Sequence, residues 1–342
     1  MQMKFNKKNE IDYSVLSRRR EDLFGLSILS IVYFHFCEVA GGRFTTPYLV
    51  LVRSIGVPIF LMLSGLGLYY SWRRNPSWKD FYKKRLARVV IPYLIVATVH
   101  FVLRYAVIEH QGMLAILKGI CFADFVLYGD SQFWFVALIL FMYVVFPLIY
   151  KIFETEEKCL IKLVIVLALV VGINLFIRFC FPGFYGKVEI MLTRIPAFII
   201  GVYLGQKSFF KRKVQPLFLL TAAFLAIIFI VYAIIKYYFD FQMVARVVYR
   251  YSETAYAFLI MLGTAVLLER LNAAKLSKVL AFFGSMSLEL YLVHISLRKL
   301  MQLLDLPVYN IMYYAVMAAI AVGVSFALSK FDGFATKKLT AK

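Results

Sequence analysis

The sequence predicts an all-α fold, a polytopic membrane helix bundle of about ten transmembrane helices with both termini in the cytoplasm. Of its 342 residues, 62% are hydrophobic and only 17% are charged, whereas soluble domains average roughly 45–50% apolar and about 25% charged residues. The mean hydropathy of +0.78 agrees with this. The four cysteines lie in no CxxC or Cys/His metal spacing. A soluble single-core domain, a disordered chain and a disulfide-stapled secreted domain are therefore excluded.

Ten segments come close to the length of about 20 apolar residues that a transmembrane helix needs. They run near 23–40, 48–70, 89–108, 132–150, 160–180, 190–206, 215–238, 253–269, 281–300 and 310–329. The stretch 112–128 is too short and too interrupted to span, so we expect it to be re-entrant or interfacial. We expect residues 1–342 to form one integral membrane domain, with 1–22 as a basic cytoplasmic N-terminal segment.

The net charge of +20 is mainly a signal of topology. If the N-terminus lies inside, most of the 39 Lys and Arg residues fall in cytoplasmic segments, as the positive-inside rule requires. Some of this charge would meet anionic lipid. The charge therefore does not call for a nucleic-acid partner.

The first apolar segment is also compatible with a signal peptide. Residues 4–20 are basic, and small residues at 39–41 would permit cleavage. However, His35 and Glu38 interrupt the end of the apolar stretch, so we expect this helix to be retained.

Ionisable residues inside a bilayer are costly, so each of them suggests a function. His35 lies about 13 residues into the first helix, roughly 20 Å from the inner surface at 1.5 Å per residue. A neutral imidazole there can accept a proton from a hydroxyl group. Glu38 shares its helical face and can orient the ring. The alternative is a packing histidine, and His100 and His294 compete for the catalytic role.

Two arginines form a second candidate group. Arg85 and Arg88 share one helical face at the cytoplasmic mouth of the third predicted helix, where two guanidinium groups suit the phosphates of a cytosolic ligand. Ordinary positive-inside anchoring is the alternative. Ser64 in the second helix can donate a hydrogen bond to a bound carbonyl, while Gly65 and Gly67 beside it indicate close helix packing.

A buried carboxylate and a buried guanidinium complete the set. Glu289 lies mid-span in the ninth predicted helix and needs a cation or a proton. Arg194 has no neutralising residue in its own span, which makes it a candidate partner for Glu289. Structural pairing and catalysis both stay open for these two residues. The sequence contains no Gly-rich phosphate loop, HExxH, GxSxG or metal-ligand cluster, so we expect no metal.

Six stretches together resemble the acyltransferase-3 family of integral membrane acyltransferases, in particular its stand-alone O-acetyltransferase type. The stretches are Ile31–His35, Gly56–Gly65, Phe81–Tyr93, Trp134–Leu138, Arg194–Gly201 and Phe283–His294. They cover most of the chain in the family's order. The resemblance implies transfer of an acyl group, usually acetyl, from cytoplasmic acyl-CoA to a sugar hydroxyl of a cell-envelope glycan, in the cytoplasmic membrane of a bacterium.

The resemblance also implies roles by position. His35 corresponds to the family's catalytic histidine, and Arg85 and Arg88 correspond to its Arg-x-x-Arg pair near the acyl-CoA. Many members carry an arginine eleven residues before the histidine, where this chain has Phe24. Either the three arginines at 18–20 supply that charge or the function does not need it. Ala197 stands where some relatives have glutamate.

The expected function is therefore a membrane O-acyltransferase. Its donor would be acetyl-CoA, and its acceptor a cell-envelope polysaccharide or a lipid-linked sugar. The alternative is a transporter or flippase of glycan precursors, which would require the inverted repeats that this sequence does not show.

Overall fold

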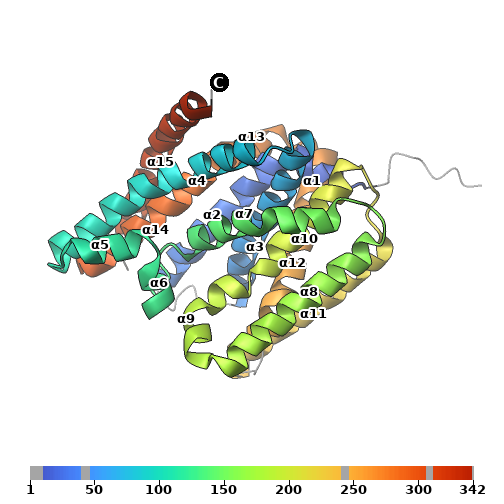
Figure 1. The fold of residues 1–342 in the computed structure, drawn as a ribbon, viewed down its shortest axis with the longest axis horizontal. Helices are drawn as coiled ribbons and strands as arrows, with labels where there is room; N and C mark the ends of the chain where they lie inside the picture. The colour runs from blue at the N-terminus through green and yellow to red at the C-terminus, as the bar shows by residue number, and fades with distance from the viewer. Residues whose placement is uncertain (1–10, 40–46, 240–245, 306–310, 341–342) are drawn as a thin grey trace, which may run out of the picture.

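The computed structural model describes residues 11–39, 47–239, 246–305 and 311–340, which form a bundle of helices (Figure 1). In this part of the chain the only β pairing is an isolated bridge between Asp12 and Lys213. Within these described residues, eight helical segments are long and apolar enough to cross a membrane, or nine if one bent pair forms a single span. The count is near ten, and the all-α membrane bundle is confirmed.

The helices follow one another with few residues between them. In chain order they are α1 (Ser14–Arg18), α2 (Arg20–Val39), α3 (Pro47–Arg74), α4 (Trp78–Phe101) with the π-helical turn η2 (Val102–Ile108), α5 (Met113–Ile120), α6 (Ala123–Tyr128), α7 (Trp134–Phe153), α8 (Cys159–Cys180), α9 (Pro182–Leu192), α10 (Ile195–Phe209), α11 (Pro216–Phe239), α12 (Arg246–Arg270), α13 (Ala274–Ser285), α14 (Ser287–Leu303) and α15 (Ile311–Thr340).

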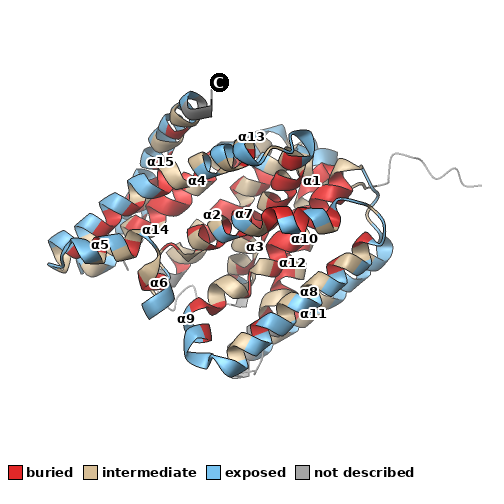
Figure 2. Cartoon of the chain, viewed as in Figure 1, coloured by how far each residue is buried: buried red, intermediate tan, exposed pale blue. Residues whose placement is uncertain are grey.

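The bundle has a core of central helices and an outer set. α3 packs along α10, and α2 packs along both α3 and α13. In the most apolar part of the span formed by α9 and α10, 72% of residues are buried, against 11% in α8. Figure 2 shows the same division, with α8, α11 and α5 largely exposed. Because exposed faces of α8 and α11 are apolar, they are suited to lipid rather than water.

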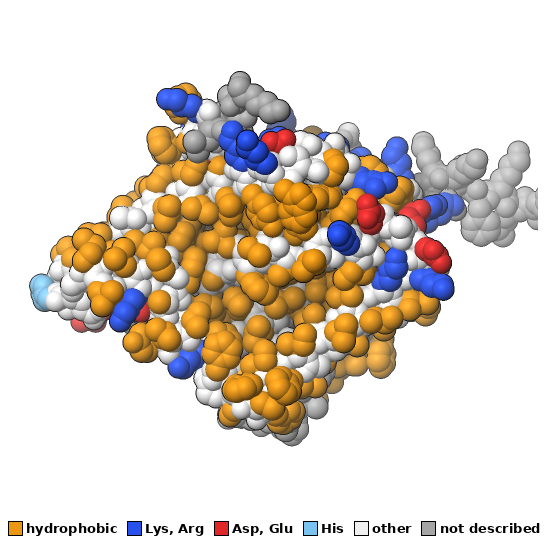
Figure 3. Space-filling view, in the orientation of Figure 1, with side chains coloured by type: hydrophobic (Ala, Val, Ile, Leu, Met, Phe, Trp, Pro, Cys, Tyr) orange, Lys and Arg blue, Asp and Glu red, His pale blue; other side chains and the backbone are white. Residues whose placement is uncertain are grey.

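Charge and apolar surface are separated on the face shown in Figure 3. Lys and Arg side chains gather along its upper and right-hand rim, while hydrophobic side chains cover most of the area between the rims. We name the two ends of the bundle after α2, which runs from Arg20 to Val39. The Arg20 end is where α2 begins, and the His35 end is where it finishes.

Three predicted spans differ from the helices observed. α4 begins at Trp78 rather than near residue 89, because the Ser77 side chain accepts a hydrogen bond from the Asp80 backbone and caps the charged first turns. The ninth span is bent by 66° between α13 and α14. The sixth span breaks between α9 and α10, at Arg194. The interrupted stretch 112–128 forms the short helices α5 and α6.

Glycines allow α3 and α10 to cross at close range. A Cβ atom at Gly201 of α10 would lie 2.2 Å from the Met62 carbonyl oxygen of α3, and one at Gly65 of α3 would lie 2.4 Å from the Phe198 carbonyl oxygen of α10. Both obstacles are backbone atoms, which cannot move aside as a side chain can. Gly65 therefore serves helix packing, as its sequence context indicated.

Replacing Gly201 with alanine is expected to destabilise the protein by about 1–3 kcal/mol, because α3 and α10 must separate to admit the methyl group. Gly172→Ala in α8 is the matched control, since its Cβ would meet no atom within 4 Å. The fraction of detergent-solubilised protein that stays monodisperse after heating measures the effect. If the two variants lost monodispersity at the same temperature, the close contact between α3 and α10 at Gly201 would be contradicted.

Candidate active site

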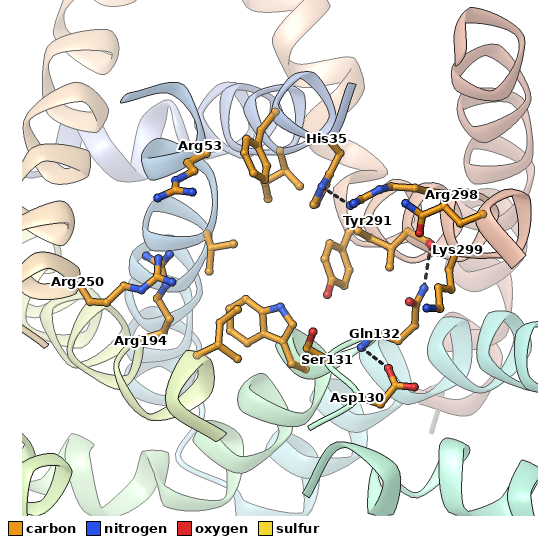
Figure 4. Close-up of a pocket in the computed structure, with 17 residues that line it drawn as sticks. His35, Arg53, Asp130, Ser131, Gln132, Arg194, Arg250, Tyr291, Arg298 and Lys299 are labelled. Atoms are coloured by element: carbon orange, nitrogen blue, oxygen red, sulfur yellow. Dashed lines mark hydrogen bonds between the residues drawn. The ribbon is translucent and has the colours of Figure 1, made fainter. Parts of the chain in front are cut away.

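A cavity of about 470 Å³, here called the His35 cavity, lies at the His35 end of the bundle (Figure 4). Helices α2, α3 and α14 supply most of its wall. The loop before α7, Trp134 at the start of α7 and the α9–α12 region supply the rest. The polar and charged lining residues are His35, Arg53, Asp130, Ser131, Gln132, Arg194, Arg250, Tyr291, Arg298, Lys299 and Gln302.

A smaller cavity of about 70 Å³, the Arg20 cavity, lies toward the Arg20 end. Both arginines of the predicted pair, Arg85 and Arg88, line it. Arg20 is the third cation of its lining, and its guanidinium lies 4.9 Å from the centre of the Phe24 ring. Of the three arginines at 18–20, Arg20 is thus the one that adds charge here, one helical turn before Phe24. Arg18 instead pairs with Glu269.

The two cavities are stacked along the same four helices. On α3, for example, Val57 lines the His35 cavity and Phe60 lines the Arg20 cavity. Three aromatic rings separate them: the Phe135 centroid lies 5.4 Å from that of Phe60 and 5.3 Å from that of Tyr291. On α3 the residues that line the two cavities are three positions apart, which corresponds to roughly 5 Å along the helix.

His35 meets a residue that the sequence analysis missed. The Arg298 Nη1 atom lies 2.5 Å from the His35 Nδ1 atom. Because a guanidinium has no acceptor, Arg298 must donate and Nδ1 must accept, which leaves the proton of the neutral ring on Nε2. Glu38 was predicted to orient the ring; it belongs to α2, but its side chain lies outside the described residues.

His294 lies beside His35, with 5.5 Å between ring centroids. Its Nδ1 atom is 2.7 Å from the Leu290 carbonyl oxygen, so Nδ1 carries the proton, and its buried Nε2 has no hydrogen-bond partner among the described residues. The side chain is only 1% exposed and does not line the cavity. His100 is also buried and contacts Ser296. Of the three competing histidines, His35 is the one that reaches the cavity.

Arg194 was predicted as a partner for Glu289, and that prediction is wrong. Arg194 Nη2 lies 3.1 Å from Glu253 Oε1, and both residues are buried. Glu253 also binds Arg250, 3.3 Å away, and Arg250 approaches Glu189 at 3.8 Å. Arg194 lies at the junction of α9 and α10, and its side chain reaches Glu253 of α12 rather than Glu289 of α14.

Glu289 is buried but lines neither cavity. The bend at Met286 makes it a first-turn residue of α14 rather than a mid-span residue. The charged groups that act on its carboxyl are Asp332 and Arg88. It therefore lies toward the Arg20 end, away from Arg194.

Ser64 lines the Arg20 cavity, but its hydroxyl donates to the Phe60 carbonyl oxygen of its own helix at 2.8 Å. A bound carbonyl would have to compete with that bond. Among the described residues, no group of three or more His, Cys, Asp and Glu side chains could hold a metal ion.

Sequence reasoning also missed Arg250 as a site residue. Arg250 lies about one turn after the start of α12 and Arg298 lies five residues before the end of α14, regions where ordinary interfacial charge is expected. One signal was available: Arg298 follows His294 by four residues and so shares a helical face with it.

Comparison with known proteins places these features in a family. The family model of the acyltransferase-3 type, described as an acyltransferase domain, matches residues 25–330. A protein of Acidianus two-tailed virus named "Putative acetyltransferase ORF330" is 23% identical over 299 residues, which cover 83% of this chain and 84% of the viral protein. No solved structure matches significantly. The family model covers most of the chain, so the chain belongs to the acyltransferase-3 family and is a multi-pass membrane acyltransferase.

Proposed function

We propose that this protein is an O-acyltransferase that moves an acyl group, in the first instance acetyl, from acyl-CoA to a hydroxyl of a cell-envelope polysaccharide or glycolipid. Its place would be the cytoplasmic membrane of a bacterium, with the Arg20 end and both termini facing the cytoplasm. The observation that carries the proposal is the stacking of a cationic cavity and a histidine-containing cavity along the same four helices.

The Arg20 cavity supplies groups suited to the phosphates of acyl-CoA. Arg20, Arg85 and Arg88 bring three guanidinium groups together, and the buried Nε of Arg85 has no hydrogen-bond partner in the described residues. Guanidinium forks bind phosphate oxygens with charge-assisted hydrogen bonds. Acetyl-CoA is therefore the proposed donor.

The acyl end must travel from this cavity to His35. Along α2, His35 follows Arg20 by 15 residues, which at 1.5 Å per residue is about 22 Å. A volume of about 70 Å³ admits only small groups. We therefore expect the rings of Phe60 and Phe135 to move when the thioester arm enters.

The chemistry at His35 is the direct attack of the acceptor hydroxyl on the thioester carbonyl. The oxygen forms the new ester bond, the carbon–sulfur bond breaks, and the hydroxyl proton passes to the imidazole. CoA leaves as a thiolate that takes up this proton from the imidazolium, which regenerates the neutral base. Because Arg298 occupies Nδ1, it must release this nitrogen before His35 can accept a proton there.

Replacing both Arg85 and Arg88 with glutamine is expected to raise the KM for acetyl-CoA at least about tenfold, with a smaller change in kcat, because charge-assisted hydrogen bonds to phosphate are lost. Release of CoA by membrane vesicles is the measurement. The double variant Lys83→Gln, Lys84→Gln is the control, since it removes the same charge from exposed neighbours that do not line the cavity. An equal rise in KM in both double variants would contradict the assignment.

The function itself is tested on the host's envelope glycans. Base-labile acetate is measured in cells with the intact gene, in a deletion strain and in the complemented strain. We expect acetate to fall in one glycan fraction of the deletion strain and to return on complementation. Membrane vesicles with labelled acetyl-CoA should label the same fraction. Unchanged acetate with an altered distribution of glycan precursors across the membrane would instead favour the transporter alternative.

A further inference from the structure

The His35 cavity carries more positive charge than proton transfer requires. Its described lining includes five Lys and Arg side chains but a single carboxylate, Asp130. That carboxylate is already paired, because Arg104 Nη1 lies 2.5 Å from Asp130 Oδ2. The described lining is therefore strongly cationic, in a part of the molecule where unbalanced charge is costly.

Three of these cations form one wall of the cavity, here called the basic wall: Arg53, Arg194 and Arg250. They come from α3, from the α9–α10 junction and from α12, and Figure 4 shows them together, across the cavity from His35 and Arg298. Three separate elements thus bring their guanidinium groups to one place.

Protein carboxylates account for only part of this wall. Glu253 and Glu189 pair with Arg194 and Arg250. Arg53 instead donates to the Tyr249 hydroxyl at 2.9 Å, and no described carboxylate lies within 4.0 Å of its guanidinium. Structural pairing therefore explains two of the three cations and leaves the third.

The basic wall also holds donors that lack acceptors. Among the described residues, the buried Nε of Arg53 and the buried Nε and Nη1 of Arg194 have no hydrogen-bond partner. Arg194 is only 5% exposed. A buried guanidinium with unused donors is unfavourable by itself, and a ligand oxyanion would satisfy it.

We propose that the basic wall binds an oxyanion of the acceptor, a carboxylate or a phosphate carried by the glycan, and so makes this enzyme selective for acidic acceptors. The inference rests on the proposed function, because it concerns the acceptor of that same transfer. Bound at Arg53 and Arg194, the oxyanion would hold the sugar across the cavity from His35. The acylated hydroxyl would then lie on the side of the acceptor away from its negative group.

The first test separates acceptors by charge. Host envelope glycans are divided by anion exchange into neutral and acidic fractions, and each is incubated with labelled acetyl-CoA and vesicles that contain the intact protein. We expect the acidic fraction to take up at least tenfold more label. Uptake by the neutral fraction alone, or equal uptake, would overturn the inference and leave the proposed function standing. No uptake by either fraction would refute the proposed function and the inference with it.

Two treatments of the acidic fraction then identify the source of the oxyanion. Carbodiimide activation followed by borohydride reduction converts sugar carboxylates to alcohols, and hydrogen fluoride removes phosphate esters. If a carboxylate binds, the first treatment abolishes labelling, and if a phosphate binds, the second does. Labelling that survives both treatments in succession would overturn the inference.

The second test uses Arg53→Gln. We expect the KM for the acidic acceptor to rise roughly ten- to hundredfold, as for a lost charge-assisted hydrogen bond, with the KM for acetyl-CoA unchanged. Arg178→Gln is the matched control, since Arg178 lies near the end of α8, a helix that contributes no residue to the lining. Arg53→Lys should restore part of the affinity by restoring the charge. If Arg53→Gln left the KM for the acidic acceptor unchanged, the proposed binding of the oxyanion by the basic wall would be contradicted.

Discussion

His35→Ala is expected to lower acyl transfer by about 10²–10⁴-fold, which is the usual contribution of a positioned general base. The loss should fall on kcat, because the imidazole does not contribute to the Arg20 cavity where the donor phosphates would bind. Initial rates of CoA release and of acetate transfer, at matched protein levels in membranes, measure the effect. Near-normal transfer by His35→Ala would refute the proposed role.

Two further variants separate a base at His35 from a base at its neighbour. The His294 side chain does not line the cavity, and its Nε2 atom is buried. We therefore expect His294→Ala to lower acyl transfer less than His35→Ala does. Arg298→Gln removes the donor that occupies His35 Nδ1. If Arg298 orients the ring, kcat falls and its pH dependence changes, whereas KM for acetyl-CoA stays constant. A larger loss in His294→Ala than in His35→Ala would move the base to His294.

Glu253→Gln is expected to produce the largest loss of stability, about 3–5 kcal/mol, because it leaves Arg194 buried without a compensating charge. Glu269→Gln is a closely matched control: it lies on the same helix, and its pair with Arg18 is exposed, with 50% and 40% of the two side chains accessible. An exposed pair contributes about 0–1 kcal/mol. Thermal midpoints of the purified variants in detergent make the comparison. Similar midpoints would show that the Arg194–Glu253 pair is not held as described.

The sequence predicts the helices well, because length and apolarity decide whether a segment can span a bilayer. It predicts the ends of the helices less well where the first turns of a helix carry charged side chains. The first three turns of α4 carry Lys79 to Arg88, and apolarity alone places its start near residue 89 instead of at Trp78. Capping by Ser77 and the long apolar stems of Lys and Arg allow the helix to continue through that region.

The candidate site, too, could be predicted from the sequence only in part. His35, Arg85 and Arg88 could be selected one at a time, since an ionisable residue in or near a span stands out in the sequence. The partner of Arg194 could not be selected, because Glu253 is 59 positions away and only the packing of α10 and α12 brings the two together. Arg298 was missed for a related reason: its contact with His35 joins residues 263 positions apart.

The aromatic layer of Phe60, Phe135 and Tyr291 has an electrical consequence. If water enters both cavities in the membrane, each takes nearly the potential of its own side, and most of the transmembrane voltage falls across the layer between them. Moving one elementary charge through 100 mV requires about 2.3 kcal/mol, whereas a neutral thioester crosses without electrical work. For the proposed acyl-CoA donor, the layer would therefore discriminate between the two ends of the molecule: the uncharged acyl end could cross, and the phosphates would stay on their own side.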